Sequence, residues 1–366
     1  MKIAHVVDCM EIGGVETLVA QMCRLQRAQG HDPQVYTVGT LGILGKQMLE
    51  EEFLVRAQVG RHLVDSARNF LSIFKELRPD VVHLHNPTPA FYAGPGARLA
   101  GVPCIISTRH GLVAPPRRFT TELKYAFAAV CCDWIVGVCD ATVANLQKLH
   151  ALPARKIVRV FNGTTPLSRV EKDQCPAKCG FTLLYVGRLA PVKNHTLLLQ
   201  AFRAARTSIS NLRLWIVGDG SERQMLERLA RDTGISLQVT FWGQQLNVAP
   251  YFSAADAFIM SSNSEGLPIS LLQAFSLGLP AIVTDVGGMS EAVRHAQASL
   301  IVPGEDPAAL SAAIVHLAKS DSDRQRYSQN ALASFNARFT LDTMVSAYSE
   351  LYRTSKRHPD TDPPRR

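Results

Sequence analysis

Residues 257–284 read AFIMSSNSEGLPISLLQAFSLGLPAIVT and contain one strand, a polar loop, a helix and a second strand. The two ends, 257–260 and 281–284, are short and apolar without alternation, which is typical of strands buried on both faces of a parallel sheet. Between them, a polar run leads into a helical stretch that begins near Pro268. The stretch therefore predicts a strand–helix–strand unit of a parallel α/β sheet.

Strand-like runs of the same kind occur along both halves of the chain and alternate with amphipathic helical stretches such as 16–28 and 222–231. We expect strands at 3–7, 34–38, 81–85, 104–108, 134–138 and 157–161, and then at 183–186, 214–217, 239–242, 257–260, 281–284 and 300–302. Six strands in each half, alternating with helices, predict two doubly wound α/β domains.

Turn residues at Asn162-Gly163-Thr164-Thr165-Pro166 separate the two series of strands. We expect an N-terminal domain over 1–165 and a C-terminal domain over 166–338. Residues 339–352 carry apolar side chains at helical spacing and predict a closing amphipathic helix. The tail 353–366 contains three prolines and alternating charges, and it is expected to be disordered.

The composition is that of a globular protein, because 46% of the 366 residues are apolar and 19% are charged. No apolar run reaches the roughly 18 residues that a membrane helix needs, and the start of the chain does not resemble a signal peptide. We therefore expect a cytoplasmic protein, with its eight cysteines reduced. The net charge of +8 is concentrated in the first half and the tail, which is compatible with an anionic partner.

Residues that follow the strands of the second half are candidates for a site, because ligands of doubly wound sheets bind beyond the carboxyl ends of the strands. Arg188 and Lys193 follow the strand at 183–186 and predict a diphosphate clamp, since Arg offers a bidentate fork and Lys a point charge. A solvated loop with surface charges is the alternative. Glu265 precedes the helix that begins near Pro268, and Gln273 lies about two turns further on, close to the same face.

In the first half, Gly13 and Gly14 separate the first strand from a helix, where the backbone can approach an anion closely. A plain tight turn is the alternative. The dinucleotide fingerprint G-x-G-x-x-G is absent, which argues against a nicotinamide enzyme. His110 lies just past a strand end and is expected to face a ligand. His83 and His85 point to one side of their strand, and structural or substrate-contact roles are favoured over a metal site for them.

Four motifs occur in order along the chain: Gly-Gly-Val-Glu at 13–16, Tyr185-Val186-Gly187-Arg188 through Lys193-Asn194, Val217-Gly218-Asp219-Gly220, and Glu265-Gly266-Leu267-Pro268 through Gly278-Leu279-Pro280. With these motifs the chain resembles the family 4 retaining glycosyltransferases over about residues 1–352. The resemblance implies a GT-B fold, in which two Rossmann-like domains flank a cleft and the closing helix packs back on the N-terminal domain.

The resemblance also implies an activity, namely transfer of a sugar from a nucleotide diphosphate donor to a glycan or lipid-linked acceptor, in polysaccharide or other cell-surface glycan biosynthesis. A UDP- or GDP-sugar is the expected donor, and neither a cofactor nor a metal is expected. Arg188 and Lys193 match the positions that bind the diphosphate, Glu265 an acid close to the donor sugar, and His110 a histidine that reaches that sugar. The donor site would further include Gly13, Gly14, Gly218, Gly266, Leu267 and Gln273.

Gln273 departs from the family pattern, in which a glutamate contacts the nucleotide ribose. A hydrogen bond to a charged acceptor contributes about 1.5–3 kcal/mol and one to a neutral acceptor about 0.5–1.5 kcal/mol, so the exchange costs roughly 1 kcal/mol of donor affinity. Two other functions stay open: a non-catalytic or donor-impaired partner protein, and a GT-B sugar-nucleotide epimerase. Nucleic-acid binding is not expected, because the basic residues do not alternate with aromatic ones.

The segment 98–124 is basic, and its charged residues are Arg98, Arg109, Arg117, Arg118, Glu122 and Lys124. One interpretation is a solvated loop. The sharper one is peripheral docking on an anionic membrane at the inner face of the plasma membrane, where a lipid-linked acceptor would be presented.

Overall fold

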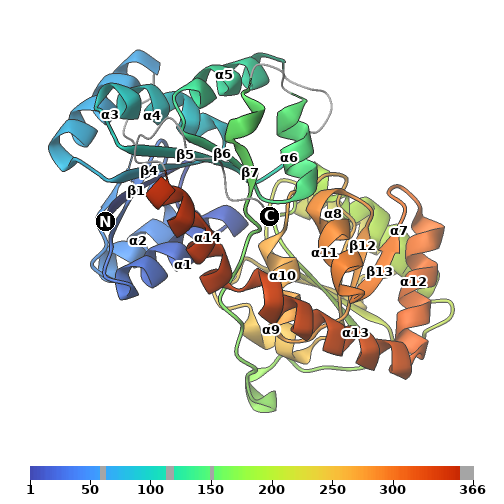
Figure 1. The fold of residues 1–366 in the computed structure, drawn as a ribbon. Coiled ribbons are helices and arrows are strands. Elements are labelled where there is room, and N and C mark those ends of the chain that lie inside the picture. Colours follow the sequence, from blue (N-terminus) through green and yellow to red (C-terminus); the bar gives the residue numbers. More distant parts are fainter. Residues whose placement is uncertain (58–62, 113–118, 149–151, 355–366) are drawn as a thin grey trace. The chain divides into compact units, whose positions relative to one another are not determined.

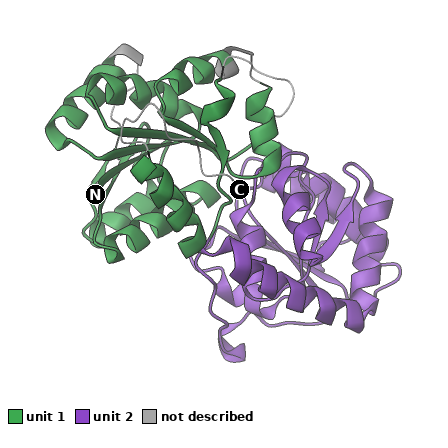
Figure 2. Cartoon of the chain, in the orientation of Figure 1, with its two compact units in different colours: residues 1–163, 341–366 green, residues 164–340 purple. Residues whose placement is uncertain are grey.

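The computed structural model describes residues 1–57, 63–112, 119–148 and 152–354, which fold as two compact units (Figure 2). Unit 1 consists of Met1–Gly163 together with Leu341–Arg366, and unit 2 consists of Thr164–Thr340. The chain therefore leaves unit 1 once and returns to it for its last helix. Each unit is built around one parallel sheet (Figure 1).

In the described part of unit 1, the sheet has the strand order β3-β2-β1-β4-β5-β6-β7, and every pair is parallel. Its strands are β1 (Lys2–Val7), β2 (Asp32–Thr37), β3 (Val55–Arg56), β4 (Val81–His85), β5 (Cys104–Arg109), β6 (Trp134–Gly137) and β7 (Ile157–Arg159). This is the order of a doubly wound sheet. The two-residue strand β3 was not expected from the sequence, because it is too short to show a pattern.

Helices cover both faces of this sheet. They are α1 (Gly14–Ala28), α2 (Gly42–Glu50), α3 (Leu63–Leu77), α4 (Pro87–Leu99), α5 (Phe119–Val130), α6 (Asp140–Gln147) and α14 (Leu341–Thr354). One apolar cluster joins the sheet to α3, α4 and α5, and a second joins it to α1 and α2. Figure 1 shows these two groups of helices on opposite sides of the strands.

The closing helix α14 contacts α1 and the central strands of unit 1. Its buried Tyr352 and Tyr348 hydroxyls lie 2.9 Å from His83 Nδ1 and 3.0 Å from Thr108 Oγ1. The expected start at Phe339 is wrong by two residues. Phe339 is buried at the end of a π-turn, η4 (Phe335–Phe339), and the extended backbone of the next residue separates that turn from α14. At the other end, α14 continues through two residues of the expected tail, and the rest of the tail lies outside the described residues.

Unit 2 repeats the architecture, with the parallel strand order β10-β9-β8-β11-β12-β13. Its strands are β8 (Thr182–Val186), β9 (Arg213–Val217), β10 (Val239–Gly243), β11 (Ala257–Met260), β12 (Ala281–Thr284) and β13 (Ser299–Val302). Its helices are α7 (His195–Ala205), α8 (Arg223–Asp232), α9 (Ala249–Ala254), α10 (Ile269–Ser276), α11 (Gly287–Ala296), α12 (Pro307–Lys319) and α13 (Asp321–Ser334). The prediction of two doubly wound α/β domains is confirmed.

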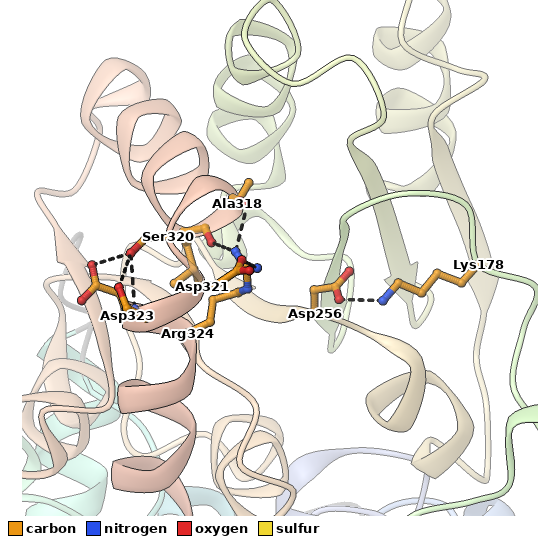
Figure 3. A network of polar contacts seen from close by, with 9 residues as sticks. Lys178, Asp256, Ala318, Ser320, Asp321, Asp323 and Arg324 are labelled. Carbon is orange, nitrogen blue, oxygen red and sulfur yellow. Dashed lines mark hydrogen bonds and ion pairs between the residues drawn. The ribbon is translucent and has the colours of Figure 1, made fainter.

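Polar contacts in unit 2 cap the start of a helix and join two segments that precede strands (Figure 3). The Ser320 hydroxyl accepts a hydrogen bond from the backbone N–H of Asp323 at 3.3 Å and thereby caps α13. Arg324, one turn into this helix, pairs with Asp321. Lys178 donates to Asp256 at 2.6 Å, which ties the segment before β8 to the segment before β11.

None of the helices within the described ranges is long and apolar enough to span a membrane.

Candidate functional site

The loop after β8 carries two of the predicted site residues and makes a sharp turn. A short 3₁₀ turn, η3 (Pro191–Lys193), is followed by Asn194 with a left-handed backbone at φ 49°. The Asn194 side-chain oxygen accepts a hydrogen bond from the backbone N–H of Leu197 at 3.3 Å and caps α7. Asparagine is suited to both tasks, since its short amide tolerates this backbone and accepts a hydrogen bond. Lys193 therefore lies directly before a capped helix.

Hydrogen bonds join this loop to the loop after β11, the neighbouring strand of the sheet. The backbone N–H of Asn263 donates to the Val192 carbonyl at 2.8 Å, and the Asn194 amide donates to Asn263 Oδ1 at 2.9 Å. The Ser261 hydroxyl donates to the Lys193 carbonyl at 3.0 Å. The two loops that carry the predicted catalytic residues are thus held as one piece at the carboxyl edge of the sheet.

Lys193 and Glu265 form an ion pair across these two loops. The ammonium donates to Glu265 Oε1, which also accepts a hydrogen bond from the Ser262 hydroxyl at 2.9 Å. Only 21% of the lysine side chain and 11% of the glutamate side chain are exposed, so water screens the pair weakly. Both contacts fall on one carboxylate oxygen, and Oε2 takes part in neither.

Arg188 lies earlier in the same loop, and its side chain is exposed. Within the described ranges its guanidinium forms no ion pair. Gly218, at the end of β9, has φ +135°, and a Cβ there would lie 2.0 Å from the Gly187 carbonyl oxygen. Only glycine permits this close approach, so the need for glycine at 218 follows from backbone packing beside Arg188.

The remaining predicted donor-site residues of unit 2 lie on and before α10. Gly266 and Leu267 are buried in the loop that leads into this helix, and Gln273 is buried within it, with 9% of the residue exposed. The described part of unit 2 therefore brings Lys193 and Glu265 into contact, places Arg188, Gly218, Gly266 and Leu267 on loops, and places Gln273 within α10.

Two buried polar rings, those of Tyr185 and His195, lie close enough to Glu265 and Lys193 for the charges of that pair to act on them. Tyr185 and His195 pack edge to face with ring centroids 4.4 Å apart. Burial, aided by the charges of Glu265 and Glu222, raises the pKa of Tyr185 well above its usual value. Burial, aided by the Lys193 charge, lowers the pKa of His195 to about 4, so this ring is neutral at pH 7. Tyr185 begins and His195 directly follows the motif of this loop, but the sequence does not reveal that the two rings pack together.

In unit 1, His110 directly follows β5. Its backbone N–H donates to Asn86 Oδ1 at 3.1 Å, and Asn86 directly follows β4, with φ 76°. His110 Nε2 lies 3.1 Å from His85 Nδ1. Burial lowers the pKa of His110 to about 4, and a side-chain hydrogen bond with Asn162 opposes this shift only in part. The structure therefore presents a neutral imidazole at the end of this strand.

Three more buried histidines adjoin His110 in the centre of the sheet. The rings of His83 and His85 stack with centroids 4.1 Å apart, so the expectation that both point to one side of β4 is confirmed. His5 lies opposite His83 in the register of β1 and β4 and 3.1 Å from His85. Although ring nitrogens of these three residues lie within 4.8 Å of one another, each ring already uses both nitrogens in hydrogen bonds. The arrangement is a hydrogen-bond network.

Gly13 and Gly14 lie at the start of α1. Gly13 is the N-cap residue, with an extended backbone at φ −161°, and Gly14 is the first residue of the helix. The nearby Asp8 has a raised pKa because of burial. These two glycines and His110 belong to unit 1, whereas the other predicted site residues belong to unit 2.

Comparison with known proteins identifies the class to which this arrangement belongs. The family model "Glycosyl transferases group 1" matches residues 172–333, and the model "Glycosyltransferase Family 4" matches residues 12–166. Together the two models account for most of the chain. The chain therefore belongs to the family 4 glycosyltransferases.

Individual relatives agree with this assignment. The chain is 32% identical over 220 residues to the lipopolysaccharide core biosynthesis glycosyltransferase LpsD of Rhizobium meliloti, covering 60% of this chain and 63% of LpsD. It is 26% identical over 370 residues to the phosphatidyl-myo-inositol mannosyltransferase of Mycobacterium leprae, covering 93% of each. The chain spans just under two thirds of the length of the first curated relatives that it matches.

Among solved structures, Anabaena HepE in complex with UDP-glucose matches with a TM-score of 0.82 at 16% identity, covering 97% of this chain and all of HepE. At this identity the likeness concerns the fold alone. The fold is GT-B, with two Rossmann-like domains.

Proposed function

We propose that this protein transfers a sugar, with retention of configuration, from a nucleotide diphosphate donor to a glycan or lipid-linked acceptor. The observation that carries the proposal is the weakly screened Lys193–Glu265 ion pair. The loops after β8 and β11 hold this pair and are joined by hydrogen bonds, and Arg188 lies on the loop after β8. Relatives support it, since LpsD is named a glycosyltransferase of lipopolysaccharide core biosynthesis. A UDP- or GDP-sugar is the proposed donor, in line with the UDP-glucose bound by HepE.

The chemistry that these residues can supply is electrostatic. When a sugar leaves its nucleotide, negative charge develops on the departing diphosphate, and fixed cations there lower the barrier. Lys193 is oriented before any ligand arrives, because Glu265 and the turn at Asn194 hold it. The contacts of Glu265 use Oε1, so Oε2 remains to accept hydrogen bonds from sugar hydroxyls. In this proposal His110 is a further contact to the sugar, and Gln273 a contact to the ribose.

A donor panel tests the proposal. UDP-, GDP- and ADP-sugars are added in a thermal-shift assay, since a ligand at 100 times its dissociation constant stabilises the folded protein by about 2.7 kcal/mol. The donor that binds is then incubated alone and with candidate acceptors. Slow hydrolysis and acceptor-dependent transfer are expected. Interconversion of the nucleotide sugar without transfer would identify an epimerase. Binding of no donor would leave a non-catalytic partner protein.

We further propose that unit 1 contacts an anionic membrane that presents a lipid-linked acceptor, at the inner face of the plasma membrane. Helix α5 exposes Leu123, Phe127 and Val130, by 58%, 64% and 62%, and their spacing places them on one face. Leu99, 70% exposed, ends the adjacent helix α4. An apolar helix face beside basic residues is typical of helices that lie in a membrane interface.

Fewer of the basic residues predicted for membrane contact are free than the sequence led us to expect. Arg98 is paired with Asp133 at 2.7 Å, and Arg109 is buried, so neither offers a free charge to a membrane. Lys124 is exposed beside the apolar face. Arg117, Arg118 and the Glu122 side chain lie outside the described residues.

Vesicle cosedimentation tests the membrane proposal. We expect the protein to sediment with anionic but not neutral vesicles and to be released by salt, because this attraction is screened. The double substitution Leu123→Ser and Phe127→Ser should abolish binding, whereas Leu237→Ser, at a 90% exposed leucine of unit 2, should not. If the wild type ignores anionic vesicles at low salt, a soluble acceptor replaces the lipid-linked one.

A further inference from the structure

One residue outside the predicted site, Glu222, approaches the loop of Arg188 and Lys193 near both of its ends. Glu222 is the N-cap residue of α8. Its backbone N–H donates to the carbonyl of Leu189, the residue after Arg188, at 3.1 Å. Its carboxylate faces His195, the first residue of α7, with Oε2 3.9 Å from the ring Nδ1. Because His195 comes two residues after Lys193, Glu222 reaches both the start and the end of the segment that carries the two cations.

The loop after β9 and the loop of Arg188 interlock through their backbones. The backbone N–H of Leu189 donates to the Asp219 carbonyl at 2.9 Å, in addition to accepting the hydrogen bond from Glu222. Gly220 leaves no space between the two segments, since a Cβ there would lie 2.2 Å from the Leu189 carbonyl oxygen. Only glycine permits this close approach. A displacement of the Glu222 backbone is therefore transmitted to the residue that follows Arg188.

The His195 ring lacks a hydrogen-bond partner although it is fully buried. Neither of its nitrogens is hydrogen-bonded in the described part of the chain. A buried polar group without a partner costs free energy that an apolar ring of similar shape does not. Only 18% of the Glu222 side chain is exposed, and among the described residues no Lys or Arg pairs with its carboxylate. A movement of about 1 Å would bring the two groups to the ~2.9 Å of an N–H···O hydrogen bond.

The surroundings of the His195 ring decide which nitrogen carries its proton. Burial, aided by the Lys193 charge, lowers the pKa of His195 to about 4, so the ring is neutral at pH 7 and has a single ring N–H. A carboxylate only accepts hydrogen bonds, so Glu222 favours the proton on Nδ1. On another side the ring packs against Tyr185, whose hydroxyl donates to the Arg188 carbonyl at 3.4 Å. Both neighbours of the ring thus also contact the segment 188–189.

We propose that Glu222 and His195 are positioning residues that fix the distance between Arg188 and Lys193. A hydrogen bond from His195 Nδ1 to the Glu222 carboxylate joins the end of the loop to the residue whose backbone holds its start. The loop is then closed by contacts at both ends, and its two cations keep a fixed spacing. This step rests on the proposed function, because the diphosphate of the donor is the group that these cations would bind.

The contact between the two side chains can be observed in the protein alone. The histidines are labelled with ¹⁵N, and long-range ¹H–¹⁵N spectra at pH 7 show which ring nitrogen carries the proton. We expect the His195 proton on Nδ1, and we expect Glu222→Ala to move it toward Nε2. Glu171→Ala, at an exposed glutamate of the same unit, is the matched control and should leave the His195 signals unchanged. A proton on Nε2 in the wild-type protein, or an unchanged tautomer in Glu222→Ala, would overturn the proposal.

A double-mutant cycle tests whether the two side chains act together. Rates of donor hydrolysis and transfer are measured for Glu222→Ala, His195→Phe and the double variant, at a temperature at which all three are folded. Misplacement of a catalytic group by about 1 Å can cost about a hundredfold in rate, so each single variant should lose about tenfold to a hundredfold in kcat, with a smaller change in KM. The double variant should lose no more than either single variant, because both changes break the same contact. Glu222→Gln retains an acceptor on a side chain of the same length and should recover part of the loss.

The results separate this proposal from the proposed function. Losses that multiply in the double variant would show that the two side chains act independently and would overturn the positioning role. If the wild-type protein transfers a sugar and Glu222→Ala is as active as Glu171→Ala, the proposed function stands and the positioning role fails. If the wild-type protein neither binds nor transfers any nucleotide sugar, both fail together.

Discussion

Replacing Arg188 by Ala is expected to separate a catalytic role of this side chain from a structural one. The Arg188 guanidinium is exposed and forms no ion pair within the described ranges, and Tyr185 contacts only its backbone carbonyl, which alanine retains. Exposed substitutions of this kind change the free energy of unfolding by about 0.5 kcal/mol or less. For a unit of this size, that shifts Tm by about 1–2 °C.

The expected loss of activity is much larger. Two unit charges 4 Å apart interact by about 1 kcal/mol in bulk water and about 4 kcal/mol at the effective dielectric constant near a protein surface. Removal of one preorganised donor to a developing anion costs about 2.7–4 kcal/mol in known enzymes. Because Arg188 is exposed, we expect the lower end of that range, which is about a hundredfold in kcat.

The assay compares initial rates of donor hydrolysis and transfer in Arg188→Ala with those in Arg203→Ala, an exposed arginine on α7 of the same unit. Lys193→Ala should lose activity and should also lower the free energy of unfolding by about 1–3 kcal/mol, because it leaves the poorly exposed Glu265 without its cation. Equal rates for Arg188→Ala and Arg203→Ala would refute the diphosphate clamp. A large fall in Tm for Arg188→Ala would refute the separation of the two roles.

Three further outcomes are expected. Gln273→Glu should tighten donor binding by about fivefold to tenfold in a titration, since a charged acceptor binds a hydroxyl more strongly, and weaker binding would show that this buried position is built around an amide. The pKa of His195 is about 4 in the folded protein and about 6.5 in the unfolded chain, so the unfolded chain binds more protons between these values and the free energy of unfolding falls as the pH falls. From pH 7.5 to 5 this loss is about 2 kcal/mol, and calorimetry should find a smaller loss in His195→Phe. Deleting 341–366 should destabilise unit 1 strongly, because its buried tyrosines contact the central strands, whereas deleting 355–366 should not change Tm; equal effects of the two deletions would contradict the packing of α14.

The strands could be predicted from the sequence because strands of a parallel sheet are buried on both faces and show as short apolar runs. All twelve expected runs form strands, and the strand order follows from the alternation with helices. The start of α14 could be predicted only less accurately than the strands. Phe339 and Leu341 are both buried and continue one apolar spacing, although the first belongs to the π-turn and the second to the helix. Hydrophobic spacing does not reveal a change of backbone conformation between two buried residues.

The candidate residues of unit 2 were accessible to sequence analysis because each loop that carries them directly follows a strand. Lys193 and Glu265 are charged residues in short motifs, and strand order alone brings their loops together. The residues that hold Lys193 and Glu265 in place could not be predicted from the sequence. Ser262 and Asn263 are common loop residues, and only the structure shows that one hydroxyl contacts the carboxylate and one amide joins the loops.

The network of buried histidines in unit 1 shows the limit of sequence analysis more sharply. A histidine on β1 and another on β4 are unremarkable separately, and each is individually best interpreted as a core residue. Their contact depends on the register of the two strands, since a shift by one residue would turn His5 to the other face of the sheet and break its hydrogen bond with His85. Charged residues in loops after strands can be found in a sequence, whereas contacts between buried neutral rings on different strands require the three-dimensional structure.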